Sequence, residues 1–304
     1  MKAVVGVDIG GTAVKIGIVG ADGEVLARGS LPYDRSLSFP ALAGVIGDRI
    51  AALTGGGISA IGVSTPGYAD PATDVLVKGV GNVPTLRGNS LSAYFRDRFG
   101  VASVTRNDGV CAAYGEYLHG AGRGHARLAV ATIGTGVGGA VVFDGKVLAG
   151  AGGFPPEFGA ITIDPDGPVD TLGTAGNLES IASGPAILRR YGGLAGLDPA
   201  GLTVEDVCRA AREGSPDALA VFDRAGRALA QAFGGMANVL NLERCILGGG
   251  VSLAGPLLLE PVRAHLPLFT FKLILPTVEV VLAQTGNDAG ILGAAAFAAG
   301  RLAA

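Results

Sequence analysis

Residues 4–19 of the chain read VVGVDIGGTAVKIGIV. Apolar side chains alternate on both sides of the glycine pair, which is typical of two β-strands joined by a tight turn. The Asp22-Gly23 pair that follows is a second hairpin turn. A dinucleotide-binding motif or a P-loop would continue into a helix, so this segment instead predicts a glycine-rich loop between two strands.

The glycine-rich loop is suited to a phosphate group. Gly10 and Gly11 carry no Cβ, so backbone N–H groups can approach an anion, and Thr12 adds a hydroxyl donor. Asp8 lies among these donors, and we expect it to hold a hydrated Mg²⁺ rather than the phosphate itself. An ordinary hairpin with a flexible turn is the alternative interpretation.

The same pattern recurs at residues 130–143, which read VATIGTGVGGAVVF and are again followed by an Asp-Gly pair. Two strand-loop-strand units of one design imply two similar domains that face a shared nucleotide. A helix of small residues, predicted from residue 288, is expected to return to the first domain. We therefore place the domains at 1–118 plus 286–304 and at 119–285.

Composition and charge exclude several classes of protein. The chain has 304 residues and a formal net charge of −3 without a basic block, which argues against a nucleic-acid partner. No apolar run approaches the ~20 residues that span a bilayer. The first strand follows Met1-Lys2 directly, so we expect a cytoplasmic protein without a secretory signal. The three cysteines and three histidines form no metal-binding spacing.

Polar residues follow several predicted strands, at the positions where α/β proteins bind ligands. Gly67 ends the turn after a strand at 58–64, and Asn82 lies in a later polar turn that a plain Asn/Pro turn explains equally well. Asn107 and Asp108 begin a predicted helix, and both side chains can cap it. Asp108 is in addition placed to act as the base of a phosphoryl transfer.

The second half of the chain carries further candidates. Glu157 ends a loop rich in Gly and Pro, and Asn177 is predicted to cap a helix that carries Glu179. The predicted strand at 245–247 runs into the triple glycine 248–250, which allows close approach of a flat ligand such as adenosine. A simple turn after the strand is the alternative.

Taken together, the sequence resembles the ROK family of sugar kinases, glucokinase-like members above all, over essentially its whole length. The resemblance implies an α/β fold of the actin, hexokinase and Hsp70 type, with two ribonuclease H-like domains and the active site in the cleft between them. Six motifs carry it, in the family's order and spacing: Asp8-Ile9-Gly10-Gly11-Thr12, Thr65-Pro66-Gly67, Asn107-Asp108, Gly134-Thr135-Gly136-Val137-Gly138-Gly139, Leu247-Gly248-Gly249-Gly250-Val251 and Asp288-Ala289-Gly290.

The resemblance implies roles for individual residues. Asp108 resembles the base that accepts the proton of a hexose 6-hydroxyl, while Asn107 and Gly67 resemble residues that hold neighbouring hydroxyls. Glu157 and Glu179 match acidic contacts near the anomeric side of the sugar. Further sugar and nucleotide contacts are expected at Asn82, Gly10, Gly11, Thr12, Thr135, Gly136, Gly249 and Gly250. For Lys15 a phosphate contact is possible, but a solvent-facing strand lysine is the simpler interpretation.

One family feature is missing from the sequence. Relatives usually carry a Glu-x-Gly-His segment and three cysteines that bind a structural zinc, and here the histidine position is Ala160 and the cysteine positions are Asp170, Leu172 and Asn177. These residues cannot form a tetrahedral S/N shell, so we predict no structural zinc. Without the imidazole, the pocket near C1 and C2 of the sugar gains space and loses a donor. This favours an amino-sugar such as kanosamine beside glucose.

The resemblance implies ATP- and Mg²⁺-dependent phosphorylation of the 6-hydroxyl of a hexose or amino-hexose, by a homodimer. Two alternatives stay open, namely polyphosphate as the phosphoryl donor and a non-catalytic sugar-responsive regulator. Family members that are repressors carry a DNA-binding region ahead of the first phosphate motif, and Asp8 lies too close to the N-terminus for one. The triple glycine favours a nucleotide as donor.

Overall fold

The computed structural model describes residues 3–55, 57–150 and 154–300. The chain divides into two compact units, of which unit 1 comprises residues 1–123, 149–155 and 285–304 and unit 2 residues 124–148 and 156–284. Each unit is built on a five-stranded sheet. Met1 and Lys2, which we expect before the first strand, lie outside the described residues. Within those residues, no helix is both long and apolar enough to cross a membrane.

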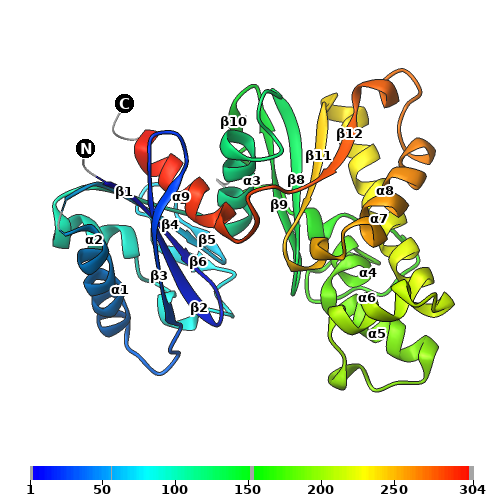
Figure 1. Ribbon diagram of the computed structural model, residues 1–304, viewed down its shortest axis with the longest axis horizontal. Helices are drawn as coiled ribbons and strands as arrows, with labels where there is room; N and C mark the ends of the chain where they lie inside the picture. Colours follow the sequence, from blue (N-terminus) through cyan, green and yellow to red (C-terminus); the bar gives the residue numbers. More distant parts are fainter. Residues whose placement is uncertain (1–2, 56, 151–153, 301–304) are drawn as a thin grey trace. The chain divides into compact units, whose positions relative to one another are not determined.

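The sheet of unit 1 has the strand order β3-β2-β1-β4-β7. Figure 1 labels the first four of these strands. β1, β2 and β3 are antiparallel neighbours joined by the two predicted hairpin turns, whereas β4 and β7 run parallel to β1. The glycine-rich loop therefore joins two strands and leads into no helix, as predicted. The strands are β1 (Ala3–Ile9), β2 (Ala13–Val19), β3 (Val25–Pro32), β4 (Ile58–Thr65) and β7 (Ala102–Asn107).

Helices cover both faces of this sheet. Side chains of α1 and α2, such as Ile46 and Phe95, pack with Val7, so these helices cover the face to which odd-numbered residues of β1 point. On the opposite face Ile291 of α9 packs with Val4. The helices are α1 (Phe39–Thr54), α2 (Leu91–Phe99), α3 (Asp108–His119) and α9 (Ala289–Gly300), the last being the predicted helix of small residues that returns to the first unit.

Helix α9 lies directly on the sheet, as its red ribbon in Figure 1 shows. A Cβ on Gly62 would overlap the backbone carbonyl group of Ala294, so only a glycine permits this approach. The first turn of α9 then meets the end of β1, because the Cβ position of Gly290 is 2.5 Å from Asp8 Oδ1. The packing thus places a helix N-terminus against the carboxylate of the first motif.

A two-stranded antiparallel ribbon, β5 (Tyr68–Ala69) with β6 (Leu76–Lys78), follows β4. Gly67 at its base has φ 88°, and a Cβ there would lie 2.5 Å from the carbonyl oxygen of Lys78. This left-handed conformation and the tight closure both require glycine. A 3₁₀-helix, η1 (Pro84–Leu86), comes before α2.

The sheet of unit 2 repeats the design of unit 1, with the order β10-β9-β8-β11-β12. β8, β9 and β10 are antiparallel neighbours, and β11 and β12 run parallel to β8. The sequence repeat is therefore a repeat of structure, as predicted. The strands are β8 (Arg127–Ile133), β9 (Val137–Phe143), β10 (Lys146–Val147), β11 (Arg244–Gly248) and β12 (Glu279–Leu282).

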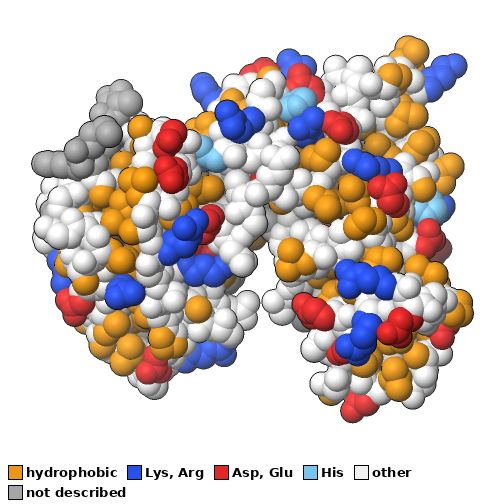
Figure 2. Space-filling view, in the orientation of Figure 1, with side chains coloured by type: hydrophobic (Ala, Val, Ile, Leu, Met, Phe, Trp, Pro, Cys, Tyr) orange, Lys and Arg blue, Asp and Glu red, His pale blue; other side chains and the backbone are white. Residues whose placement is uncertain are grey.

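The core of unit 2 is formed by the sheet and by the long helix α7, whose Phe222 and Phe233 are almost fully buried. The helices are α4 (Leu178–Ala182), α5 (Gly184–Ala195), α6 (Val204–Arg212), α7 (Pro216–Leu240) and α8 (Pro256–His265). Short 3₁₀-helices are η2 (Phe158–Ala160), η3 (Pro199–Gly201), η4 (Gly250–Ala254), η5 (Leu266–Leu268), η6 (Leu275–Thr277) and, in unit 1, η7 (Gly286–Asp288). On the face shown in Figure 2, basic and acidic side chains are interspersed.

Candidate functional site

In unit 1 the candidate residues gather at the carboxyl ends of the parallel strands β1, β4 and β7. Asp8 lies near the end of β1 and accepts a hydrogen bond of 2.6 Å from Ser64 Oγ at the end of β4. Lys15 of β2 is paired directly with Asp8 in the antiparallel ladder, so the two side chains share a face of the sheet. Lys15 is partly exposed, and its side chain is a neighbour of the Asp8 carboxylate.

Opposing effects act on the Asp8 carboxylate. Burial raises its pKa, whereas the Ser64 hydrogen bond and the positive charge of Lys15 lower it. The N-terminal turn of α9 beside it also favours the ionised form. A carboxylate that accepts a hydrogen bond from a single side chain, as Asp8 does from Ser64, is a suitable partner for a hydrated cation.

Asp108 is the first residue of α3, next to the end of β7. Its Oδ1 accepts a hydrogen bond of 2.9 Å from the N–H of Gly109, and the side chain is exposed to solvent. The surrounding protein raises the pKa of Asp108, the Gly109 hydrogen bond lowers it, and the charge of Asp8 raises it further. The two carboxylates are therefore close enough to interact electrostatically.

Asn107 is the N-cap of α3, as its Oδ1 accepts a hydrogen bond of 3.2 Å from the N–H of Val110. Its Nδ2 donates to the carbonyl oxygen of Gly67 at 3.1 Å. Both side chains therefore satisfy N–H groups at the helix start, Asn107 as the N-cap and Asp108 from the first helical residue. The amide also ties the helix start to the base of the β5–β6 ribbon.

The first glycine-rich loop is bordered by residues that lie far away in the sequence. The Cβ position of Gly11 is 3.5 Å from Asn82 Cβ and 3.7 Å from a guanidinium nitrogen of Arg35. The structure therefore brings Asn82, predicted from the sequence, to the exposed Thr12 end of the hairpin. Sequence reasoning missed Arg35, because it belongs to no motif and only the fold carries the segment after β3 to this loop.

In unit 2 the second glycine-rich loop is connected to α4 by Glu179. The carboxylate oxygen Oε2 accepts a hydrogen bond of 2.9 Å from the N–H of Val137, and it lies against Gly136. Asn177 caps α4, as predicted, through a hydrogen bond of 2.9 Å from the N–H of Ser180 to its Oδ1. Glu179, for which the resemblance implies a sugar contact, thus holds the loop that carries Thr135 and Gly136.

Glu157 lies immediately before η2 and is exposed. Partial desolvation by the surrounding protein raises the pKa of Glu157, and the negative charge of Glu179 raises it further. The fold therefore brings together the two glutamates that sequence reasoning had paired. Two neighbouring carboxylates form a region suited to hydroxyl or amino groups of a ligand.

The triple glycine lies beside the second glycine-rich loop. A Cβ on Gly249 would meet the backbone of Ile133, whereas among the described residues, the chain neighbours aside, no atom lies within 4 Å of the Cβ position of Gly250. The N–H of Gly184, at the start of α5, donates to the carbonyl oxygen of Gly134 at 2.8 Å. The open space at Gly250 is consistent with close approach of a flat ligand.

The segment 164–177 is held by hydrogen bonds around a buried asparagine. Asn177 Nδ2 donates to Asp170 Oδ1 at 2.7 Å, and the N–H of Leu172 donates to the same oxygen at 2.8 Å. No group of three or more His, Cys, Asp or Glu residues with metal-binding geometry occurs in the described part of the chain. A pocket of about 550 Å³ adjoins this segment, and its lining includes Thr135, Glu179 and Arg189.

Comparison with known proteins places the chain in a family. Residues 4–301 match the model of the ROK family. The chain belongs to the ROK family. It is similar to the glucokinase of Thermotoga maritima, with 34% identity over 96% of both chains. Among solved structures, it resembles a ROK family glucokinase from Streptomyces griseus in complex with glucose and AMPPNP, with 30% identity and a TM-score of 0.80. The match covers 98% of this chain and 99% of the glucokinase chain.

A ROK hexokinase from Thermus thermophilus is also similar, with 28% identity, 99% coverage of both chains and a TM-score of 0.84. Since the match spans the whole chain, the fold is the two-domain α/β fold of actin and hexokinase. The fold prediction is therefore confirmed. The roles of individual site residues stay predictions.

Proposed function

We propose that this ROK protein transfers the terminal phosphoryl group of ATP to the 6-hydroxyl of a hexose or amino-hexose. The observation that carries the proposal is the placement of two carboxylates at one edge of the unit 1 sheet, Asp8 near the end of β1 and Asp108 directly after the parallel strand β7. One carboxylate suits a hydrated Mg²⁺ and the other suits the attacking hydroxyl. The full-length similarity to glucokinases supports a sugar and a nucleotide as the ligands.

Asp108 is the proposed base. Its pKa is raised above the ordinary value, so the ionised carboxylate is a better proton acceptor than a free aspartate. The N–H of Gly109 holds one carboxylate oxygen, which leaves the other for the sugar hydroxyl. Because phosphoryl transfer develops little charge on the nucleophile, the base contributes less than the positioning of the reactants. Asn107, Gly67 and Asn82 are proposed to hold the other hydroxyls.

The phosphate groups are proposed to contact the two glycine-rich loops, through backbone N–H groups and the hydroxyls of Thr12 and Thr135. Gly249 and Gly250 are proposed to face the adenosine. Asp8 fits Mg²⁺ because a single carboxylate, completed by waters and phosphate oxygens, is the usual protein contribution to such a site. When bound, Mg²⁺ would neutralise charge that develops on the phosphate oxygens.

The sugar is proposed to be glucose or an amino-hexose of kanosamine type. Glu157 and Glu179 supply two interacting negative charges, and one oxygen of Glu179 is already occupied by the N–H of Val137. Ala160 offers no donor at the position where relatives carry an imidazole. A ligand that brings its own cationic donor, such as an ammonium group, is therefore stabilised here.

ADP release with a panel of hexoses and amino-hexoses tests the proposal. We expect turnover with ATP and Mg²⁺, and no turnover with a 6-deoxy sugar, because the accepting oxygen is then missing. Turnover with polyphosphate and none with ATP would replace ATP as the donor, and no turnover with any sugar and donor would refute the proposal.

Asp108→Asn is expected to lower kcat by about 10²–10⁴-fold, with nucleotide affinity measured by calorimetry nearly unchanged. Asp48→Asn, which removes an exposed ion pair with Arg98 in the same unit, is the control and is expected to leave kcat unchanged. Near-normal kcat in Asp108→Asn would remove Asp108 from the mechanism.

A further inference from the structure

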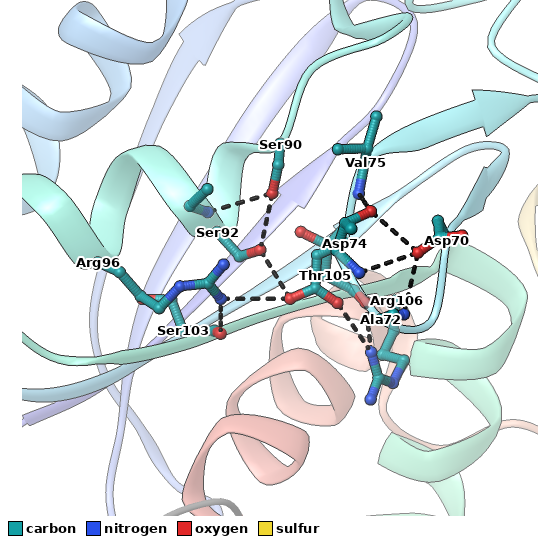
Figure 3. Close-up of polar contacts among 12 residues, drawn as sticks. Asp70, Ala72, Asp74, Val75, Ser90, Ser92, Arg96, Ser103, Thr105 and Arg106 are labelled. Atoms are coloured by element: carbon teal, nitrogen blue, oxygen red, sulfur yellow. Dashed lines mark hydrogen bonds and ion pairs between the residues drawn. The ribbon is translucent and has the colours of Figure 1, made fainter.

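A buried aspartate outside all the motifs connects the β5–β6 ribbon to the rest of unit 1. Asp74 is 3% exposed and stands in the turn of the ribbon (Figure 3). Its φ of 57° is one that residues other than glycine adopt rarely, and asparagine and aspartate tolerate it best. A buried charged side chain in such a conformation persists only where its surroundings hold it.

Three side chains from two other elements surround the Asp74 carboxylate. Ser92 Oγ donates to Oδ2 at 2.9 Å, and a guanidinium nitrogen of Arg96 lies 3.3 Å from the same oxygen. A nitrogen of Arg106 lies 3.5 Å from Oδ1. Figure 3 shows the carboxylate between these groups, with Ser92 and Arg96 on α2 and Arg106 on β7. Asp74 therefore joins the turn of the ribbon to a helix and to a strand of the sheet.

Each partner is itself fixed. Ser92 Oγ lies 3.2 Å from the oxygen of Ser90, which caps α2. The same nitrogen of Arg96 that contacts Asp74 donates to the carbonyl oxygen of Ser103 at 2.8 Å, and that of Arg106 donates to the carbonyl oxygen of Thr105 at 2.7 Å. The guanidinium groups thus approach Asp74 from fixed directions, since backbone oxygens orient them.

The ribbon has a second attachment at its base, where Asn107 donates to the carbonyl oxygen of Gly67. Arg106 and Asn107 are consecutive, so the end of β7 holds the ribbon at its turn and at its base. Asn107 caps the helix that carries Asp108, and the chain leaving the ribbon passes to Asn82 beside the first glycine-rich loop. Asn107, Gly67 and Asn82, which are proposed to hold sugar hydroxyls, therefore lie on, or next to, the segment that Asp74 fastens.

We propose that Asp74 is a positioning residue for sugar binding, which acts by fastening the β5–β6 ribbon through Ser92, Arg96 and Arg106. This inference rests on the proposed function. Loss of the carboxylate releases the turn of the ribbon and lets Gly67 and Asn82 move. It leaves Asp108 in place, because the N–H of Gly109 and the Asn107 cap hold that residue.

The test compares Asp74→Ala, Asp74→Gly and Asp74→Asn with the control Asp48→Asn. We expect the KM for the sugar to rise at least tenfold in Asp74→Ala and Asp74→Gly and less in Asp74→Asn, which keeps an acceptor oxygen. The kcat and the KM for ATP are expected to change less than about threefold. Glycine relieves the unfavourable φ, so a defect shared by Ala and Gly traces to the lost carboxylate rather than to backbone strain.

Asp48→Asn removes a 2.6 Å ion pair between Asp48 of α1 and Arg98 of α2, the helix that also carries Ser92 and Arg96. Its KM for the sugar is expected to stay unchanged. An equal rise in KM for this control, or a normal KM in Asp74→Ala and Asp74→Gly, would overturn the proposal.

Amide hydrogen exchange of the unliganded protein separates this inference from the proposed function. We expect faster exchange in Asp74→Ala at residues 67–83 and unchanged exchange in α1 and in unit 2. Faster exchange throughout unit 1 would mean a general loss of stability and would overturn the positioning role. If the wild type phosphorylates no sugar, the proposed function fails, whereas local exchange still reports whether Asp74 fastens the ribbon.

Discussion

Replacement of Asn177 measures how a hydrogen-bonded asparagine holds the segment 164–177. Asn177 is fully buried, its Oδ1 caps α4, and its Nδ2 donates to Asp170 Oδ1 at 2.7 Å. Loss of a cap costs about 1 kcal/mol. Loss of a hydrogen bond to a charged acceptor costs about 1.5–3 kcal/mol. Asn177→Ala is therefore expected to lower the free energy of unfolding by about 2–4 kcal/mol.

A double-mutant cycle isolates the bond between the two side chains. Asp170→Ala alone is expected to cost about 1.5–3 kcal/mol, but much less in the Asn177→Ala background, so the coupling energy is at least about 1 kcal/mol. Asn177→Ser keeps a capping oxygen and loses the donor, and it is expected to fall between wild type and Asn177→Ala.

Urea unfolding followed by far-UV circular dichroism supplies the free energies, because the chain has no tryptophan to report by fluorescence. A coupling energy near zero, or a change below about 0.5 kcal/mol in Asn177→Ala, would refute the reasoning.

Four further outcomes are expected. Chelation with EDTA should leave the Tm unchanged and elemental analysis should find no stoichiometric zinc, whereas a lower Tm after chelation would contradict the predicted loss of the zinc site. Gly62→Ala should lower the free energy of unfolding, measured in urea, by about 1–3 kcal/mol or more, because its Cβ overlaps the Ala294 carbonyl group. Gly193→Ala is the control and should not destabilise, because its Cβ meets no atom of the described residues within 4 Å apart from its chain neighbours. The pKa of Asp108 is raised above 3.8, the ordinary value for aspartate, because the surrounding protein desolvates its carboxylate, and only the ionised form accepts a proton. The kcat should therefore fall as the pH falls through that raised pKa, and a pH profile flat down to 3.8 would contradict this. Arg35→Gln should lower kcat/KM about tenfold in the ADP-release assay, since the Arg35 guanidinium lies 3.7 Å from the Cβ position of Gly11. A kcat/KM equal to that of the wild type would place Arg35 outside the site.

Local patterns predicted much of the secondary structure. Helices α2 and α6 begin after a serine cap and a threonine cap, and the chain leaves helical geometry at Gly100 and Glu213, so neighbouring residues set the bounds of both helices. The hairpins were equally predictable, since alternating apolar residues around glycine and Asp-Gly turns are local signals. Candidate side chains within motifs followed from the same patterns.

The sequence by itself determined the two strand-loop-strand units, the caps and the residues that could serve a phosphate or a sugar. These features depend on neighbours within a few positions, where side-chain chemistry acts directly on the backbone. Only the tertiary structure decided that Lys15 shares a face with Asp8, that Arg35 borders the first loop, and that Asp74 fastens the ribbon to α2 and β7. Such contacts join residues that are distant in the chain, and they form only when strand register and helix packing have set which faces meet.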